Sequence, residues 1–272
     1  MSKFTFENKV FIITGSSSGI GKAIALALAR KGAQVVLNGR NEERLRTTES
    51  ELLAITANII SVCADVSTIS GAQELIDKTI ERFHKIDGLI NNVGVSMRGR
   101  IADLNPEVYK TVFESNVLGT VYPTIPALTH LRKNEGSIVF ISSLAAVHGL
   151  PFLSAYSSSK LALRAIVESL RIEEVKHKVH VGLVLVGITA IEDNKEAINF
   201  DGSKIILEKR DARKVQSTEQ VAQAVLNNIS KRKFITVQTT IGKINAFLHA
   251  RFPLLVERIL IKNIHKFDHF NK

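Results

Sequence analysis

A tyrosine and a lysine four residues apart, Tyr156 and Lys160, are the clearest candidates for chemistry in this sequence. On a helix, residues four apart lie on the same face. A tyrosine with its ordinary pKa of about 10 is a weak acid–base catalyst near neutral pH, and a nearby lysine charge would lower that pKa. Ser143 can donate a hydrogen bond to the same reacting oxygen. These groups suit reduction of a carbonyl by hydride, in which the oxygen must gain a proton.

A glycine-rich stretch near the N-terminus could bind a phosphate. It runs Thr14-Gly15-Ser16-Ser17-Ser18-Gly19-Ile20-Gly21, between an apolar run at 9–13 and strong helix formers at 22–30. Such a strand, turn and helix start direct backbone N–H groups and the positive helix end at an anion. A plain strand-to-helix turn is the alternative. The expected contacts to a cofactor are Gly15, Ser17, Ser18, Gly19, Ile20 and Gly21.

Short apolar runs alternate with helical patterns along most of the chain, and these elements must position the candidate residues. The expected strands are residues 9–13, 33–38, 58–64, 88–90, 136–141, 180–186 and 234–238. The expected helices are residues 22–30, 41–57, 72–83, 106–132, 155–176 and 217–231. This alternation predicts an α/β fold with a Rossmann-like, doubly wound parallel sheet of about seven strands and helices on both faces.

Together the motifs resemble the short-chain dehydrogenase/reductase family over about residues 8–240. They are the stretch at 14–21, Asn91-Asn92-Val93-Gly94, Ser143 and the Tyr156–Lys160 pair, in this order and at these spacings. The resemblance implies that Asn116, Ser143, Tyr156 and Lys160 are catalytic. In the family the lysine also holds the nicotinamide ribose, and the asparagine that matches Asn116 supports a water-mediated proton relay.

The end of the second expected strand bears on the choice of cofactor. An acid about 20 residues after the glycines binds the adenosine ribose and selects NAD. Here the strand ends at Gly39-Arg40 without an acid, and Arg40 could pair with a 2′-phosphate, so we expect NADP(H). A solvent-facing Arg40 is the alternative. The resemblance adds cofactor contacts at Asp65, Val66, Asn91, Asn92, Gly94, Tyr156, Lys160, Gly187 and Thr189; Asp65 could also cap a helix.

Some positions depart from the family's pattern or stand outside it. Val186-Gly187 replaces the usual Pro-Gly and Val93 the usual alanine, and we expect both to be tolerated. Met97, Arg98 and His148, near the expected substrate entrance, are interpreted as rim residues rather than catalysts. No metal is expected, because the remaining histidines lack a convincing ligand geometry; they include His249, His265 and His269.

The chain is expected to form one domain, residues 1–241, with an extension at 242–272. Residues 188–216 are polar and long for a loop, which favours a substrate lid over a passive surface excursion. The lid hints at an apolar substrate through Ile188, Ile191, Ile198, Phe200, Ile205, Ile206 and Leu207.

The extension is basic. Of the net charge of +10, nine Lys/Arg against two acids leave +7 in the 42 residues from Lys231 to Lys272. Pro253 separates two helical patterns, and an apolar face of the second is formed by Val256, Ile259, Leu260, Ile264 and Phe267, with Arg258, Lys262, His265 and Lys266 largely elsewhere. This helix could pack on the body or a second subunit, or lie on an anionic membrane. Nucleic-acid binding is not expected, since no recognition motif accompanies the charge.

The composition and the resemblance complete the expectations. The single cysteine, Cys63, excludes an intrachain disulfide, and no signal peptide or spanning apolar run is seen, so we expect a cytoplasmic protein, with or without peripheral membrane contact. The resemblance implies a homodimer or homotetramer. The predicted function is hydride transfer between NADP(H) and a carbonyl or secondary alcohol, with an apolar substrate favoured. The alternative is a non-catalytic NADP(H)-binding regulatory or scaffolding protein, which would not need the catalytic residues.

Overall fold

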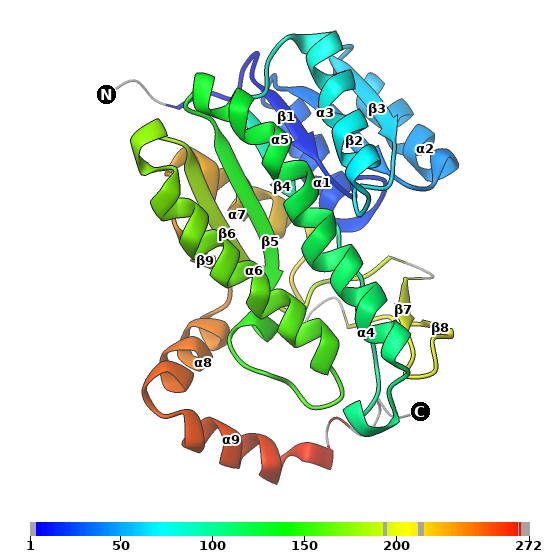
Figure 1. Ribbon diagram of the computed structural model, residues 1–272, viewed down its shortest axis with the longest axis vertical. Coiled ribbons are helices and arrows are strands. Elements are labelled where there is room, and N and C mark those ends of the chain that lie inside the picture. The colour runs from blue at the N-terminus through cyan, green and yellow to red at the C-terminus, as the bar shows by residue number, and fades with distance from the viewer. Residues whose placement is uncertain (1–3, 193–194, 212–214, 266, 268–272) are drawn as a thin grey trace.

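A computed structural model describes residues 4–192, 195–211, 215–265 and 267 of the chain. Its centre is a sheet of seven parallel strands in the order β3-β2-β1-β4-β5-β6-β9 (Figure 1). The strands are β1 (Val10–Ile13), β2 (Gln34–Gly39), β3 (Ile59–Cys63), β4 (Gly88–Asn91), β5 (Ser137–Ser143), β6 (His180–Val186) and β9 (Ile235–Val237). The predicted α/β fold with a parallel sheet is confirmed.

Helices cover both faces of this sheet (Figure 1). One face carries α1 (Gly19–Ala29), α2 (Glu42–Leu53) and α7 (Thr218–Ser230); the other carries α3 (Ile69–Phe83), α5 (Gly119–Lys133) and α6 (Ser154–Glu173). Successive residues of β1 alternate between the two cores: Phe11 and Ile13 face α1, whereas Val10 and Ile12 face α3. Burial on both faces explains why these strands read as continuous apolar runs.

The direction of winding changes between β1 and β4. From β1 the chain builds outward to β2 and β3, then returns to place β4 on the other side of β1. In such sheets, ligands bind at the carboxyl ends of the strands beside this switch point. The glycine-rich turn follows β1 and the Asn91–Gly94 stretch follows β4, so both motifs lie at that edge.

The expected helix at 106–132 is interrupted. It consists of α4 (Pro106–Phe113), a π-helical segment (Glu114–Leu118) and α5. Asn116 lies in the π-helical segment, with its side chain fully buried. A single wide turn inside a helix is typical of functional sites, and helical periodicity alone does not reveal it.

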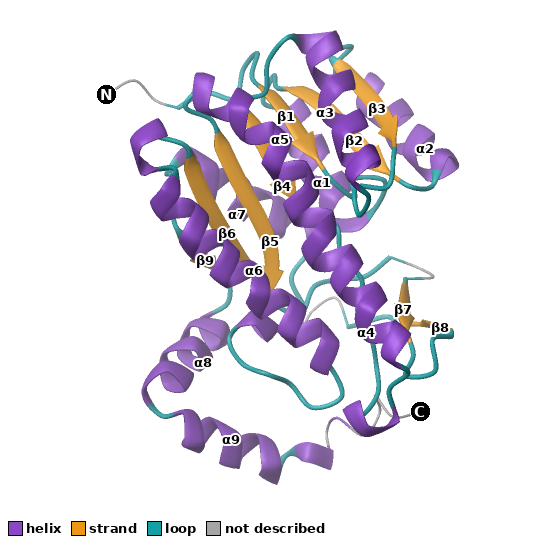
Figure 2. Cartoon of the chain, viewed as in Figure 1, coloured by secondary structure: helices purple, strands orange, loops and turns teal. Residues whose placement is uncertain are grey.

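The lid at 188–216 contains a small antiparallel hairpin that the sequence analysis did not predict, formed by β7 (Glu196–Ile198) and β8 (Lys204–Ile206) (Figure 2). It is tied to the loop after β4: the Arg98 N–H donates to the Ile198 carbonyl at 2.8 Å, and the Ile198 N–H donates to the Ser96 carbonyl at 2.9 Å. Short 3₁₀ turns lie at Ile101–Asp103, Leu144–Ala146 and Val175–His177.

The extension consists of α8 (Thr240–Arg251) and α9 (Pro253–Lys262). The boundary predicted at 241–242 falls inside the first turn of α8, because Thr239 caps this helix by accepting from the Gly242 N–H at 3.0 Å. No described helix is both long and apolar enough to cross a membrane. Lys266 and residues 268–272, part of the expected extension, lie outside the described residues.

Candidate active site

A cavity of about 880 Å³ lies at the carboxyl ends of the strands, beside the switch point. It extends from the glycine-rich turn to Tyr156. The expected site residues that line it are Gly15, Ser17, Ser18, Gly19, Ile20, Arg40, Asp65, Val66, Asn92, Gly94, Ser143, Tyr156, Lys160, Gly187 and Thr189. The structure therefore brings most of the expected set into one continuous space.

The glycine-rich turn is shaped for close approach of a ligand. Gly15 and Gly19 adopt φ values of +62° and +54°, which side-chain-bearing residues rarely adopt. A Cβ on Gly19 would meet nothing within 4 Å, so this glycine is required by its backbone conformation. Asn92 fixes the turn from β4, since its side-chain amide donates to the carbonyls of Thr14 at 3.1 Å and Gly15 at 3.0 Å.

Two expected cofactor residues do not line the cavity. The Asn91 side chain is buried and donates to the Thr124 hydroxyl at 2.9 Å, so it joins β4 to α5. A Cβ on Gly21 would collide with the Gly15 carbonyl, which explains this glycine by the packing of α1 under the turn. Both residues therefore hold the backbone around the cavity in place without lining it.

Tyr156 lies on the wall of the cavity with its expected partners around it. A hydrogen bond joins its side chain to that of Ser143. The Lys160 Nζ lies 5.9 Å from the centre of the Tyr156 ring and donates to the Ile141 carbonyl at 3.2 Å. The two side chains share one face of α6, as their spacing predicts.

Asn116 lies outside the cavity lining, next to the segment that contacts Lys160. Its Oδ1 accepts from the Val95 N–H at 2.7 Å, and its Nδ2 donates to the Val95 carbonyl at 3.0 Å and the Ser159 hydroxyl at 2.9 Å. A Cβ on Gly94 would lie 3.1 Å from both Asn116 Oδ1 and Lys160 Nζ. Gly94 therefore keeps open the space shared by these two side chains.

The pKa of Tyr156 shifts in the direction opposite to the one expected. Burial raises this pKa above its ordinary value, and the hydrogen bond from Ser143 and the positive charges of Arg98 and Arg210 offset only part of the rise. Burial also lowers the pKa of Lys160 to about 8. The sequence analysis expected the Lys160 charge to lower the pKa of Tyr156, and this expectation was wrong: burial favours the neutral form of both groups.

Arg40 stands at the other end of the cavity. Its Nη1 lies 3.4 Å from Asp65 Oδ2, and both side chains are well exposed. Burial acts to raise the pKa of Asp65, but hydrogen bonds from Ser67 and the Arg40 charge hold it below the usual value. Thr68, rather than Asp65, caps α3. Arg40 is therefore held by one long, exposed contact with Asp65.

The sequence analysis missed three charged residues of the site. Glu192 of the lid accepts from the Gly19 N–H at 2.5 Å, so a carboxylate occupies the anion position at the start of α1. Arg98, interpreted as a rim residue, is only 6% exposed and lines the cavity. Arg210 lines it from the lid. Each is brought in by a loop, and loop residues carry no periodic signal.

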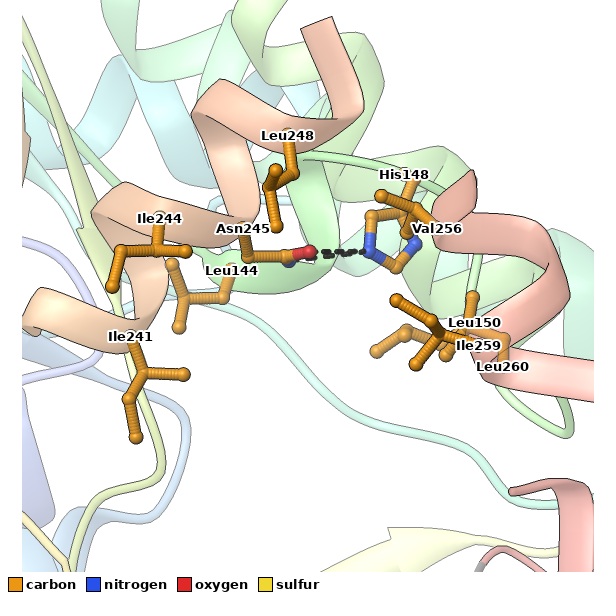
Figure 3. A pocket seen from close by; sticks show the side chains of 10 residues that line it. All are labelled: Leu144, His148, Leu150, Ile241, Ile244, Asn245, Leu248, Val256, Ile259 and Leu260. Carbon is orange, nitrogen blue, oxygen red and sulfur yellow. Dashed lines mark hydrogen bonds between the residues drawn. The ribbon is translucent and has the colours of Figure 1, made fainter. Parts of the chain in front are cut away.

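His148 lies in a second, smaller cavity of about 340 Å³, between the loop after β5 and helices α8 and α9 (Figure 3). Its Nδ1 donates to the Gly149 carbonyl at 2.9 Å, so its Nε2 accepts from the Asn245 amide at 3.2 Å. The apolar lining includes Val256, Ile259 and Leu260 of the face expected in the extension. His148 thus links the active-site loop to the extension instead of facing a substrate.

The burial of Lys160 makes a prediction for the free protein. Below pH 8 this lysine is protonated in both states, so folding carries the cost of burying a charge. Between about pH 8 and its ordinary pKa of 10.5 the unfolded chain binds more protons, so stability rises with pH. Lys160→Met should therefore be more stable than wild type at pH 7, with the difference shrinking toward pH 10.5.

Urea denaturation of the two proteins across this pH range measures the effect. Lys243→Met, which removes an exposed lysine, is the matched control and should follow wild type throughout. A difference between Lys160→Met and wild type that stays constant with pH would contradict the assignment.

Comparison with known proteins identifies the family. The sequence model of the short chain dehydrogenase family matches residues 9–202. The Bos taurus protein named Dehydrogenase/reductase SDR family member 7B is 34% identical over 273 residues, covering 96% of this chain and 82% of the relative. The Arabidopsis thaliana 11-beta-hydroxysteroid dehydrogenase-like 3 is 36% identical over 237 residues, covering 83% and 72%.

Solved structures agree. An alcohol dehydrogenase from Thermococcus sibiricus, complexed with 5-hydroxy-NADP, is 28% identical with a TM-score of 0.75, covering 85% of this chain and 96% of that one. A short chain dehydrogenase/reductase from Burkholderia phymatum in complex with NAD has a TM-score of 0.81 at 24% identity, covering 93% and 96%, a likeness of fold. Its motifs, its fold and these relatives show that the chain belongs to the short-chain dehydrogenase/reductase family of oxidoreductases, which use a nicotinamide cofactor.

Proposed function

We propose that this protein is an NADP(H)-dependent oxidoreductase that interconverts a carbonyl compound and a secondary alcohol. The observation that carries the proposal is the single cavity that joins the glycine-rich turn to Tyr156, Ser143 and Lys160. The cavity fits a dinucleotide: a carboxylate already binds the Gly19 N–H where a phosphate would bind, and Gly94 leaves space beside Lys160.

The bound nicotinamide would supply or accept the hydride. The protein's own groups handle the proton. Tyr156 would donate its hydroxyl proton to the carbonyl oxygen, and Ser143 would donate a hydrogen bond to the same oxygen as negative charge develops on it. Lys160, with a pKa of about 8, can be charged or neutral near physiological pH, which suits a group that passes a proton back to Tyr156. Asn116 holds the Val95 backbone beside this lysine.

A purely regulatory cofactor-binding protein is the less favoured alternative. Such a protein needs the glycine-rich turn and Arg40, but it gains nothing from a lysine buried at an energetic cost beside a tyrosine. The relatives named as 11-beta-hydroxysteroid dehydrogenase-like support an apolar alcohol or ketone as substrate for this chain.

Replacing Tyr156 with phenylalanine tests the reaction. The variant should lose activity by about 10²–10⁴-fold, because it removes the general acid while keeping the ring that fills the wall. The readout is NADPH oxidation with a panel of carbonyl compounds, and the dissociation constant for NADPH, measured in parallel, should change little. Turnover close to that of wild type would contradict the role of Tyr156.

The preference for NADP(H) rests on Arg40, which lies at the cavity edge with no acid at the end of β2. Arg40→Asp removes a partner for the 2′-phosphate and adds a repulsive charge. A charge-assisted hydrogen bond is worth about 1.5–3 kcal/mol, so the ratio of kcat/KM for NADPH over NADH should fall more than tenfold. Arg44→Asp, in α2 and outside the cavity lining, is the control. A wild-type enzyme that prefers NADH would refute the argument.

Assembly and location are further proposals. The family resemblance favours a homodimer or homotetramer through α5 and α6, and exposed Ile125 on α5 and Ile172 on α6 support it; the molar mass in solution checks it.

We also propose that the protein is cytoplasmic and contacts an anionic membrane through α8 and α9. One side of this pair packs on the body, yet its exposed apolar residues include Ile241, Phe247, Leu254 and Ile261, with Lys243, Arg251, Arg258 and Lys262 on the same helices.

Vesicle binding tests the membrane contact. Binding should require anionic lipid and weaken as salt rises, because each Lys or Arg near such a surface contributes about 1 kcal/mol that salt screens. Leu254→Glu should reduce binding, whereas Ile69→Glu, at an equally exposed isoleucine on α3, should not. Absence of binding to anionic vesicles at low salt would leave packing against protein as the role of the extension.

A further inference from the structure

Two arginines from different segments line the cavity, and the charges of both act on Tyr156. Arg98 follows β4, and its Nη1 donates to the Ser96 hydroxyl and the Met97 carbonyl, both at 2.8 Å. Arg210 belongs to the lid, and its Nη1 donates to the Thr189 carbonyl at 2.8 Å. These bonds fix each guanidinium group on the backbone of its own segment, and both side chains line the cavity.

The charges of both arginines act on Tyr156. They act to lower the pKa of Tyr156, against the larger effect of burial. The two arginines also repel each other: burial and, second, the Arg210 charge lower the pKa of Arg98 to about 10. Two cations thus stand close to the reacting group, and one of them is 94% buried. A negative charge bound beside them would offset the repulsion between the two arginines.

Charge is distributed unevenly along the cavity. Among the described residues that line it, the acids are Asp65 and Glu192. Asp65 contacts Arg40, and Glu192 binds the Gly19 N–H, so both stand at the dinucleotide end. The catalytic end has Arg98 and Arg210 together with an apolar wall, formed by Val95, Leu150, Leu153, Ile188 and Leu207.

We propose that the substrate is an amphipathic anion: a carbonyl or alcohol compound with an apolar body and a carboxylate or phosphate group that is bound by Arg98 and Arg210. Guanidinium groups bind both kinds of anion through paired N–H donors. The phosphates of the cofactor are accounted for by the glycine-rich turn and Arg40 at the other end. This inference rests on the proposed oxidoreductase function and adds the substrate class to it.

Matched substrates test the inference in wild-type enzyme. The probes are a medium-chain oxo acid, its methyl ester and an oxoalkyl phosphate of the same length, each assayed by NADPH oxidation. The acid or the phosphate should exceed the ester in kcat/KM by about ten- to a hundredfold, as expected for one charge-assisted contact; which of the two is better identifies the anion. An ester that reacts as well as both anions would overturn the proposal.

Variants separate substrate binding from an effect on Tyr156. Arg210→Gln should raise KM for the anionic probe about tenfold or more, whereas KM for the ester should not change, and Arg210→Lys should recover part of the loss in KM. Arg100→Gln removes an exposed arginine from the loop of Arg98, outside the cavity lining, and should match wild type. If Arg210→Gln lowers kcat for ester and acid alike and leaves both KM values unchanged, Arg210 acts only through Tyr156 and the proposal fails.

Binding without reaction distinguishes this inference from the proposed function. An alkyl carboxylate that lacks the carbonyl should bind the NADPH complex in calorimetry, and Arg210→Gln should weaken it about tenfold. Such binding together with no oxidation of NADPH by any probe would refute the proposed activity and keep the anion site. NADPH oxidation by neutral ketones, without binding of the alkyl carboxylate, would support the proposed activity and refute the anion site.

Discussion

The amide of Asn92 joins the two strands between which the winding of the sheet changes direction. It donates from the end of β4 to the carbonyls of Thr14 and Gly15 at the end of β1, while the Thr14 hydroxyl accepts from the Asn92 N–H at 3.0 Å. These bonds hold the glycine-rich turn against the segment that leads to Gly94 and Arg98. The dinucleotide end and the catalytic end of the cavity therefore keep a defined relation, because both are attached to this junction.

Electrostatics at the site follow from burial. Lys160 is 5% exposed, and burial disfavours its charged form. Burial also disfavours the charged form of Tyr156, although Ser143 and the charges of Arg98 and Arg210 act in the opposite direction. Tyrosine in its neutral form is the proton donor that reduction needs, and a lysine with a pKa of about 8 can restore that proton.

The parts of the site that the sequence predicted are those set by local pattern. Apolar runs located the seven strands, and the spacing of Tyr156 and Lys160 was enough to place them on one face of α6. The prediction did not reach the π-helical segment at Asn116, because the chain stays helical through Glu114–Leu118 and only its hydrogen-bond pattern changes. It also missed the hairpin β7–β8, whose strands are three residues long and largely exposed.

Other misses depended on contacts between distant residues. Asn91 and Asn92 are adjacent in sequence, but a strand turns successive side chains to opposite faces, so one reaches Thr124 and the other the glycine-rich turn. Arg98 is drawn inside because its backbone pairs with Ile198, about a hundred residues away. No local pattern encodes such pairings.

The lid connects the two ends of the cavity. Glu192 near its start binds the Gly19 N–H, and Arg210 near its end donates to the Thr189 carbonyl beside the catalytic groups. A carboxylate and a phosphate cannot both accept from the same N–H, and their like charges repel each other. A dinucleotide bound at the turn therefore requires Glu192 to leave it. Because Glu192 and Arg210 belong to one segment, this segment supplies charged side chains to both ends of the cavity.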